Sequence, residues 1–591
     1  MGSIDANDLH EPCPPQLESP TQELAELRRK SERKAEEHAR LVVVSNRVAD
    51  LSAACQSGGL AVAMTEALRV RGGLWFGWSG KTHKNAARTA PRLHRFDSIL
   101  TATVDLTPAE HKHYYLGFAN RCLWPLLHYR LGLTEIDTSA QRVYIGVNRR
   151  FAAQLAPLLQ PGDRIWVHDY HLIPLAEALR RRHGVRHQIG FFLHTPFPPP
   201  EVFAAAPRYR RLARALFAYD LIGFQTKRDR ENFARLVVEA LGGQRLDNGR
   251  LTAFGQTVMA GAFPIGIDPA WIAEAAARRA NGSALRGFRR SLGQQSLIVG
   301  VDRLDYTKGL VEKFAAFEAL LEAHEEQAGR VTMLQIAPPT REGVEAYDAV
   351  RSQLEAMAGR INGRFGDFTW VPVRYIHRSI SRDDLAGLFR HARVGLVTSL
   401  RDGMNLVAKE FVAAQNPADP GVLVLSCFAG AAEQLTEALL VNPHDIQGVA
   451  AALHRALTMP LEERRTRHEA LWRKIASHSV ERWREHFLKR LQATAVERSD
   501  GALRPDGTTG SFQLTEHEPR SRAEAFTGWP PDGREEQRRL PRRVQAARSL
   551  AANLPPPPLT ARESRFGSGD EPETAPTGHS GAAARRRWNG H

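Results

Sequence analysis

The sequence lacks the segments that would carry a chain into or across a membrane. No uncharged apolar stretch reaches the ~18 residues of a membrane-spanning helix. The first residues, MGSIDANDLHEPCPPQ, show no basic region followed by an apolar one, so we expect no secretory signal. Ala6 stands where myristoylation at Gly2 would require Ser or Thr. These absences predict a cytoplasmic protein.

Cysteine is scarce as well. The four cysteines of the 591-residue chain, Cys13, Cys55, Cys122 and Cys427, are scattered and form no CxxC pair. This argues against a disulfide framework or a cysteine zinc site and fits a reducing compartment. There is also no GxxxxGK[ST] loop and no GxGxxG after a strand, which weakens ATPase and dinucleotide interpretations. No cluster has metal-ligand spacing, so we predict no metal site and no cofactor.

The charge balance favours anionic small molecules. Lys and Arg number 80 against 65 Asp and Glu, a net charge of +15 with a pI near 9.9. A nucleic-acid partner would suit that charge. However, the arginines are spread along the chain among acids, and no basic helix with interleaved aromatics occurs. We therefore expect no nucleic-acid role.

Composition changes along the chain predict four parts. Residues 1–38 form a polar extension, with a charged helical pattern over 23–40. From about 499 to 591, repeated Gly, Ser and Pro, including LPPPPLT, predict a disordered tail. The region between has an apolar content typical of globular proteins. It divides near FPIGIDP (263–269), which predicts domains at 39–267 and 268–498.

Short apolar runs alternate with helix-length segments in both of these domains. This alternation predicts βαβ units with parallel sheets, and continuously apolar strands predict sheets covered on both faces. The fold class is therefore α/β, with two doubly wound domains joined by a short hinge. The apolar runs are 41–45, 165–167, 189–193, 221–224, 298–301, 333–336, 394–397 and 422–425.

Polar and basic residues recur just after these runs. In an open parallel sheet, ligands bind beyond the carboxyl ends of the strands, so these positions predict a ligand site between the domains. Singly, each could be a surface ion-pair partner or a hydrogen-bonded core histidine. The residues are Asn46, Arg47, His168, Asp169, Tyr170, His171, His194, Asp302, Arg303, Asp305, Lys308, Arg341, Arg401 and Asp402.

One stretch, LRDGMNLVAKE (400–410), predicts a strand, a tight turn at Asp402-Gly403 and a helix over 406–414. The free N–H groups and the positive dipole end of such a helix suit anionic oxygens. Asp402 could accept from hydroxyls, and Glu410, one turn in, could reach a diol. On its own the stretch also fits an ordinary strand–turn–helix crossover. The cations Arg47, Arg303, Lys308 and Arg341 elsewhere favour a sugar phosphate bound beside a nucleotide sugar.

With these residues identified, the chain closely resembles the trehalose-6-phosphate synthases. Matching blocks run in family order over about 41–491 and include SNRVA, GGLWFGWSG, WVHDYHLIP, IGFFLHTPFPPPEVF, VDRLDYTKGL and GLVTSLRDGMNLVAKEFVAAQ. The resemblance implies a GT-B fold of two Rossmann-like domains facing an interdomain cleft. It implies transfer of glucose, with retention, from UDP-glucose to glucose 6-phosphate, giving α,α-trehalose 6-phosphate and UDP. It also implies small-molecule substrates only, with a homodimer or homotetramer as the expected assembly.

The resemblance also assigns residues. Thr195 stands where some family members have isoleucine, near the acceptor pocket, where it could tune anomeric selectivity. Glucose 6-phosphate would be bound by Arg47, Tyr115, Trp124, Asp169, Thr195 and Arg341. The donor would be bound by Gly58, Gly59, His194, Arg303, Lys308, Ile380, Asp402, Gly403, Met404, Asn405, Leu406, Val407, Ala408, Lys409 and Glu410.

Within these sets, four residues would carry catalysis: His194, Arg303, Lys308 and Asp402. Arg303 and Lys308 would stabilise the charge that develops on the leaving diphosphate, without a metal. The leaving phosphate itself would help to deprotonate the acceptor hydroxyl on the same face of the sugar.

Other interpretations stay open from sequence. A relative could use glycerol 3-phosphate as acceptor, or GDP- or ADP-glucose as donor, because backbone groups would make most contacts to the base. A non-catalytic sugar-phosphate sensor could keep the fold, although Arg303, Lys308, Asp402 and Glu410 are all present. The absence of a DxDxT phosphatase motif after the synthase-like region predicts that the product is not dephosphorylated.

Overall fold

A computed structural model describes residues 40–51, 59–340 and 345–501. The chain separates into two compact units, 1–505 and 506–591, and all described residues lie in the first. The predicted extension over 1–38, most of its helical pattern, and the tail beyond 501 lie outside the described residues. Gly58 and Arg341 of the predicted site also lie outside them.

The first lobe is built on a sheet of ten described strands in the order β3-β4-β2-β1-β5-β6-β7-β10-β9-β8. The strands from β4 to β10 in that order pair in parallel, whereas β3, β9 and β8 at the edges are antiparallel. The bounds are β1 Leu41–Arg47, β2 Gly73–Thr82, β3 Arg92–Phe96, β4 Ile99–Leu106, β5 Arg164–His168, β6 Gln188–Phe192, β7 Leu221–Phe224, β8 Gln244–Arg245, β9 Arg250–Ala253 and β10 Gln256–Ala262.

Helices connect these strands. The α-helices are α2 Gly59–Arg71, α3 Pro108–Glu110, α4 Trp124–Leu127, α5 Thr138–Leu155, α6 Leu175–His183, α7 Pro200–Phe203, α8 Tyr209–Leu216 and α9 Lys227–Arg235. Two π-helices are η2 His111–Leu123 and η6 Leu236–Ala240. Short 3₁₀ turns are η1 Ala86–Arg88, η3 Leu131–Leu133, η4 Ala156–Leu158, η5 Tyr170–Leu172 and η7 Asp247–Gly249.

The second lobe has an all-parallel sheet of six described strands in the order β13-β12-β11-β14-β15-β16. The strands are β11 Ser296–Val301, β12 Val331–Ile336, β13 Val373–Ile376, β14 Val394–Val397, β15 Val422–Ser426 and β16 Leu439–Val441. The helices that follow β10 along the chain are α10 Pro269–Arg279, α11 Ser283–Leu292, α12 Leu310–Ala323, η8 Glu325–Gln327, α13 Glu345–Phe365, α14 Arg382–His391, α15 Leu406–Ala414, η9 Gly430–Glu433, α16 Ile446–Thr458, α17 Leu461–Ser477 and α18 Val480–Gly501.

The predicted strands are confirmed, and so is their burial. Every residue of β5, β7, β12, β14 and β15 is buried, as expected for parallel strands covered on both faces. Edge strands such as β3, in which four of five residues are exposed, were not predicted because they have no continuous apolar run. The α/β fold class therefore holds for both lobes.

Each sheet has a point where the chain reverses its direction of growth. In the first sheet the chain builds from β1 outward through β2 and β4, then returns to place β5 on the other side of β1. In the second sheet β11, β12 and β13 grow one way, and β14 begins the other. Ligands of such folds bind at these switch points. The residues at the ends of β1 and β5 and just after β5, β11 and β14 are among those that the sequence singled out.

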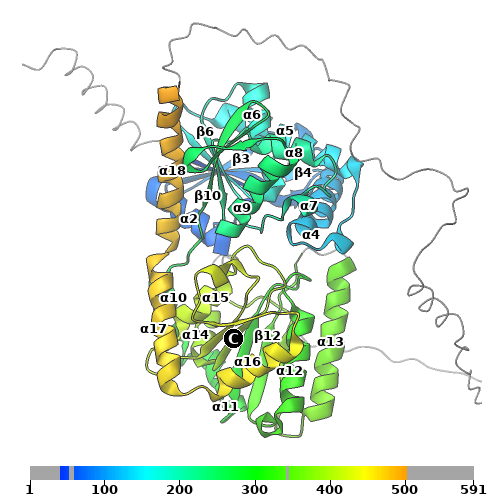
Figure 1. Cartoon of the computed structure of the whole chain (residues 1–591), viewed down its shortest axis with the longest axis vertical. Coiled ribbons are helices and arrows are strands. Elements are labelled where there is room, and N and C mark those ends of the chain that lie inside the picture. The colour runs from blue at the N-terminus through cyan, green and yellow to red at the C-terminus, as the bar shows by residue number, and fades with distance from the viewer. Residues whose placement is uncertain (1–39, 52–58, 341–344, 502–591) are drawn as a thin grey trace, which may run out of the picture. The chain divides into compact units, whose positions relative to one another are not determined.

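The predicted second domain, 268–498, includes a last helix that contacts the first lobe. Helix α18 contacts β6, β7 and α2 (Figure 1). The Phe487 ring stacks on Trp166 at 4.7 Å, and it fills the space left by two strand glycines: a Cβ on Gly190 or Gly223 would lie 2.8 Å from it. The chain therefore crosses between the lobes twice, near residue 265 and again before α18.

Candidate active site

The predicted donor-side stretch is confirmed as a strand, a turn and a helix. Strand β14 and helix α15 have the predicted bounds. The Asn405 side chain caps α15 by accepting from the Ala408 N–H at 3.2 Å. The remaining free N–H groups of the first helical turn, with the positive end of the helix dipole, form a local site for anionic oxygens.

The turn before α15 approaches the first lobe closely. A Cβ on Gly403 would lie 2.0 Å from the carbonyl oxygen of His194, so no other residue fits there without displacing a backbone. Asn405 has a φ of 78°, a conformation that costs a non-glycine residue ~1–3 kcal/mol. Strain of this size persists only where the surroundings enforce it, and such positions cluster at functional sites.

Lys308 and Asp402 form an ion pair within the second lobe. The Lys308 Nζ donates to Asp402 Oδ2 at 2.5 Å, and Ser399 and Asn405 donate to the same oxygen. Burial alone would raise the pKa of Asp402, but the Lys308 ammonium outweighs it, and the pKa lies below its ordinary value. Asp402 is therefore an anion and an acceptor, not a proton donor.

Arg303 and its neighbour Asp302 face different surroundings. Asp302 is buried and pairs with Lys313 at 2.5 Å beneath the sheet end. Arg303 is exposed, and its guanidinium lies 5.6 Å from the ring of Trp124 in the first lobe. The structure thereby brings a predicted donor residue beside a predicted acceptor residue.

Glu410 lies near Arg382, which was not predicted from sequence. The Arg382 Nε lies 3.5 Å from Glu410 Oε1, and its guanidinium lies over the ring of Trp271 at 4.3 Å. Burial raises the pKa of Glu410, and the positive charge of Arg382 opposes that rise. The only signal in the sequence is that Arg382 lies two residues after the predicted Ile380. Ile380 is half-buried and packs against the core that also contains part of α15.

The residues predicted to bind the acceptor include two aromatic side chains of the first lobe, Tyr115 and Trp124. Tyr115 stands on the π-helix η2, a rare form that often marks functional positions. Its ring stacks on His111 at 5.5 Å and on His171 at 5.9 Å. Trp124, at the start of the next helix, is buried. Such ring faces suit the apolar faces of a sugar.

Asp169 and Arg47 come from the two strands at the switch point. Asp169 follows β5 with a φ of 75°, and its carboxylate accepts from the His194 N–H at 3.2 Å. Arg47 ends β1 and is exposed, with its side chain passing over Gly80, where a Cβ would lie 2.7 Å from Arg47 Nε. Gly59 begins helix α2, and its predicted partner Gly58 is not described.

The His194 imidazole is held by protein groups on both nitrogens. Gln225 Oε1 accepts from the Ile265 N–H, so its Nε2 faces His194 Nδ1 at 3.4 Å. His194 Nε2 then carries the proton and faces His168 Nδ1 at 3.1 Å. Burial lowers the pKa of His194 to about 3. The ring is neutral, and the His194 group nearest the donor-side turn is its backbone carbonyl.

Two further predicted residues differ in what they offer a ligand. Thr195 is buried, and its Oγ1 has no hydrogen-bond partner among the described residues. A buried unpaired hydroxyl is costly and suits a substrate contact. Lys409, by contrast, is buried facing away: its Nζ donates to Ile265 O at 2.6 Å and to Gln434 Oε1 at 2.7 Å. Only its backbone is available to the donor.

The remaining predicted donor residues lie in the turn before α15 and in its first part, and they differ in burial. Met404 and Ala408 are buried, whereas Leu406 and Val407 are half-buried against the core beneath the helix. The site residues that the sequence did not single out are Tyr129, Gln225 and Arg382, whereas His168 and Arg401 are among the residues predicted from the strand ends. Arg401 Nη2 donates to Tyr129 OH at 2.6 Å and joins the two lobes beside the Asp402 turn.

Two sheets whose switch-point residues meet in this way, one presenting a helix terminus with a Lys–Asp pair and the other a ring-lined surface, are typical of a glycosyltransferase of the GT-B fold. A model of glycosyltransferase family 20 matches residues 31–493, and the chain belongs to this family.

Several trehalose-6-phosphate synthases are similar to this chain, and two of the solved ones contain a bound ligand. The trehalose-6-phosphate synthase of Sinorhizobium fredii is 49% identical over 459 residues, 77% of this chain and 99% of that protein. A solved UDP-forming α,α-trehalose-phosphate synthase of Burkholderia xenovorans, in complex with glucose 6-phosphate, is 50% identical with a TM-score of 0.74, and the match covers 77% of this chain and all of that one. An Escherichia coli structure bound with UDP-2-fluoro glucose is 46% identical with a TM-score of 0.73, over 77% and 99%.

Helices of membrane-spanning length and apolarity are absent from the described part of the chain.

Proposed function

We infer that this protein transfers glucose, with retention, from UDP-glucose to glucose 6-phosphate, giving α,α-trehalose 6-phosphate and UDP. The observation that carries this conclusion is the meeting of the Asp402–α15 turn with the His194 backbone, which sets the donor-binding helix terminus against the acceptor lobe. The membership in glycosyltransferase family 20 and the full-length match to UDP-forming synthases agree with it.

The described residues suit leaving-group stabilisation better than nucleophilic attack by a carboxylate. Asp402 is held as an anion by Lys308, and this supports a role in accepting from donor hydroxyls. The α15 terminus with Lys308 and Arg303 would hold the diphosphate and offset its developing charge. His194 is neutral at physiological pH and would bind through its carbonyl rather than by proton transfer. The leaving phosphate is then the base for the acceptor hydroxyl.

The acceptor would lie on the first lobe. Tyr115 and Trp124 would pack on the glucose ring, Asp169 would accept from its hydroxyls, and the Arg47 fork would bind the phosphate, with Arg341 as a second cation. The orphaned Thr195 hydroxyl would face the reacting sugars. On the donor side, Glu410 would bind the ribose diol, and Ile380 would pack on the uracil.

A single assay tests the reaction and its substrates. The purified chain is given UDP-, GDP- or ADP-glucose with glucose 6-phosphate or glycerol 3-phosphate, and nucleotide release is followed with product analysis. We expect release with UDP-glucose and glucose 6-phosphate. No release with any pair would refute enzymatic activity, and release only with glycerol 3-phosphate would refute the acceptor.

We also propose that this reaction needs no metal ion, because Lys308, Arg303 and the α15 terminus could offset the charge of the diphosphate. Activity should therefore survive excess chelator, and a loss restored only by a divalent cation would contradict this.

A cytoplasmic location is proposed from the scattered cysteines, of which Cys122 and Cys427 are free thiols. A homodimer or homotetramer is proposed from the family resemblance, and light scattering of the purified chain tests it.

A further inference from the structure

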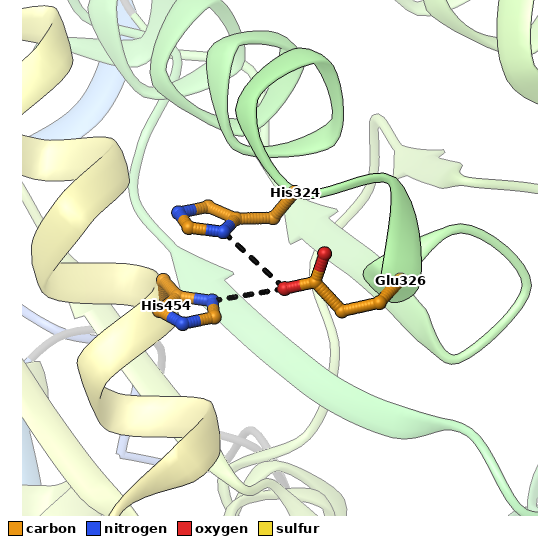
Figure 2. Close-up of side chains that lie close together, drawn as sticks. All are labelled: His324, Glu326 and His454. Carbon is orange, nitrogen blue, oxygen red and sulfur yellow. Dashed lines mark ion pairs between the residues drawn. The ribbon is translucent and has the colours of Figure 1, made fainter.

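We propose that His324, Glu326 and His454 form a binding site for one borderline divalent cation, such as Zn²⁺, in the second lobe. His324 directly follows helix α12, Glu326 lies in the short turn η8, and His454 stands on helix α16 (Figure 2). This site is distinct from the donor and acceptor residues, and it does not depend on the proposed transferase activity.

The separations of the ligand atoms suit one ion. Glu326 Oε1 lies 3.3 Å from His324 Nδ1 and 3.8 Å from His454 Nδ1, and all three ligand atoms lie within 4.8 Å of one another (Figure 2). Around a tetrahedral ion with bonds of ~2.0–2.2 Å, ligand atoms lie roughly 3.4 Å apart. The three atoms are therefore close enough to bind one ion once a side chain has turned.

The imidazole of His454 has a buried nitrogen without a hydrogen-bond partner among the described residues. This nitrogen is Nδ1, and it faces the Glu326 carboxylate. A polar atom left in this state destabilises the fold, and a bound cation would supply its partner. Two imidazoles and one carboxylate are the donor set of zinc sites rather than of Mg²⁺ or Ca²⁺ sites, which use oxygen.

The arrangement of the rings indicates how binding would proceed. The two imidazoles stack at 3.6 Å with an angle of 6° between their planes (Figure 2). A metal lies near the plane of each imidazole that binds it, so two parallel rings cannot share an ion until one turns. His324 follows the end of its helix and has more freedom to turn than His454, which is fixed within α16. The site therefore requires a local rearrangement, and its affinity should be lower than that of a closed four-ligand zinc site.

A bound ion would cross-link helices α12 and α16 of the second lobe. Helices α12 and α16 pack against each other, and the ion would tie the carboxyl end of α12 to the middle of α16. Helix α12 begins two residues after Lys308 and spans 14 residues, roughly 20 Å at 1.5 Å per residue. The ion would thus be too far away to touch either substrate, and it would stabilise the lobe without entering the reaction.

The test uses the full chain without a polyhistidine tag, stripped of metal with a chelator. Zn²⁺ is titrated by calorimetry at about pH 7.5, and Co²⁺ is used as a spectroscopic probe. We expect one equivalent of Zn²⁺ to bind and a visible Co²⁺ band typical of tetrahedral coordination. Bound Zn²⁺ should raise Tm by ~1–3 °C at a hundredfold excess over Kd.

Matched variants separate this site from histidines elsewhere. His324→Gln and His454→Gln should each lose the binding event and the Co²⁺ band while keeping the metal-free Tm within ~2 °C. His94→Gln, an exposed histidine of the first lobe, should bind as the unaltered chain does. Equal Zn²⁺ stoichiometry in the unaltered chain and His454→Gln, or no binding by the unaltered chain, would overturn the proposal. Such a result would leave the glucosyl-transfer assay unaffected.

Discussion

At the scale of single residues, Arg382 controls the charge of the group expected to bind the ribose. Replacing Arg382 by Ala removes the one positive charge seen to oppose the burial of Glu410, so the pKa of Glu410 should rise further. We expect KM for UDP-glucose to rise roughly 10–150-fold, with KM for glucose 6-phosphate unchanged, since a lost charge-assisted hydrogen bond is worth ~1.5–3 kcal/mol. Initial rates with each substrate varied in turn measure this.

Donor binding should also depend on pH through Glu410, and Arg382 should set the pH at which the change begins. Because burial raises the pKa of Glu410, its carboxylate becomes protonated at a higher pH than that of an exposed glutamate. KM for the donor should therefore rise on the acid side, and in Arg382→Ala this rise should begin at higher pH. The exposed Arg378 gives the control, and a similar shift in Arg378→Ala would contradict the assignment.

The Thr195 hydroxyl gives a second prediction at this scale. Thr195→Val keeps the shape and removes a hydroxyl without a protein partner, so Tm should be unchanged or slightly higher. Loss of one hydrogen bond to substrate should lower kcat/KM by roughly 3–10-fold. Thr195→Ser should restore most of the activity. A clear loss of Tm with full activity in Thr195→Val would show that the hydroxyl serves the fold instead.

At the scale of elements, Lys409 fastens helix α15 to the segment that joins the lobes. Burial lowers its pKa to about 7, and a neutral amine has two hydrogens for its two acceptors, Ile265 O and Gln434 Oε1. Between pH 7 and its ordinary pKa the unfolded chain binds the extra proton, so stability from this group rises with pH. Chemical denaturation should show this rise from about pH 7 to 9, and Lys409→Met should abolish it.

The docking of α18 makes the first lobe depend on the end of the described chain. Phe487→Ala should destabilise the protein by about 3–5 kcal/mol. The substitution removes a buried ring that packs against Trp166 and two strand glycines, and it leaves a cavity there. Hydrogen exchange should increase first in β6 and β7. Faster exchange confined to the second lobe would instead support the boundary predicted at 498.

At the scale of the whole molecule, the sequence revealed the parts that leave a continuous pattern. The buried strands, the α15 helix and the switch-point residues all lie in local runs of chain. The docking of α18 could not be predicted, because its periodicity shows an apolar face but not which sheet receives it. The chain His168–His194–Gln225 was also missed, since its members lie 26 and 31 residues apart and meet only in the fold. Arg341 and Gly58 keep their roles as predictions.

The contact of Gly403 with His194 sets how closely the two substrate-binding halves can meet. In Gly403→Ala the new methyl group would overlap the His194 carbonyl, and one backbone or the other must move by about 1 Å to relieve it. Misplacement of that size between reacting groups should lower kcat at least 100-fold. Gly359, on helix α13 with nothing within 4 Å, provides the control, and Gly359→Ala should keep full activity. If Gly403→Ala retained normal turnover while folded, as shown by near-UV circular dichroism, the catalytic alignment would not depend on this contact.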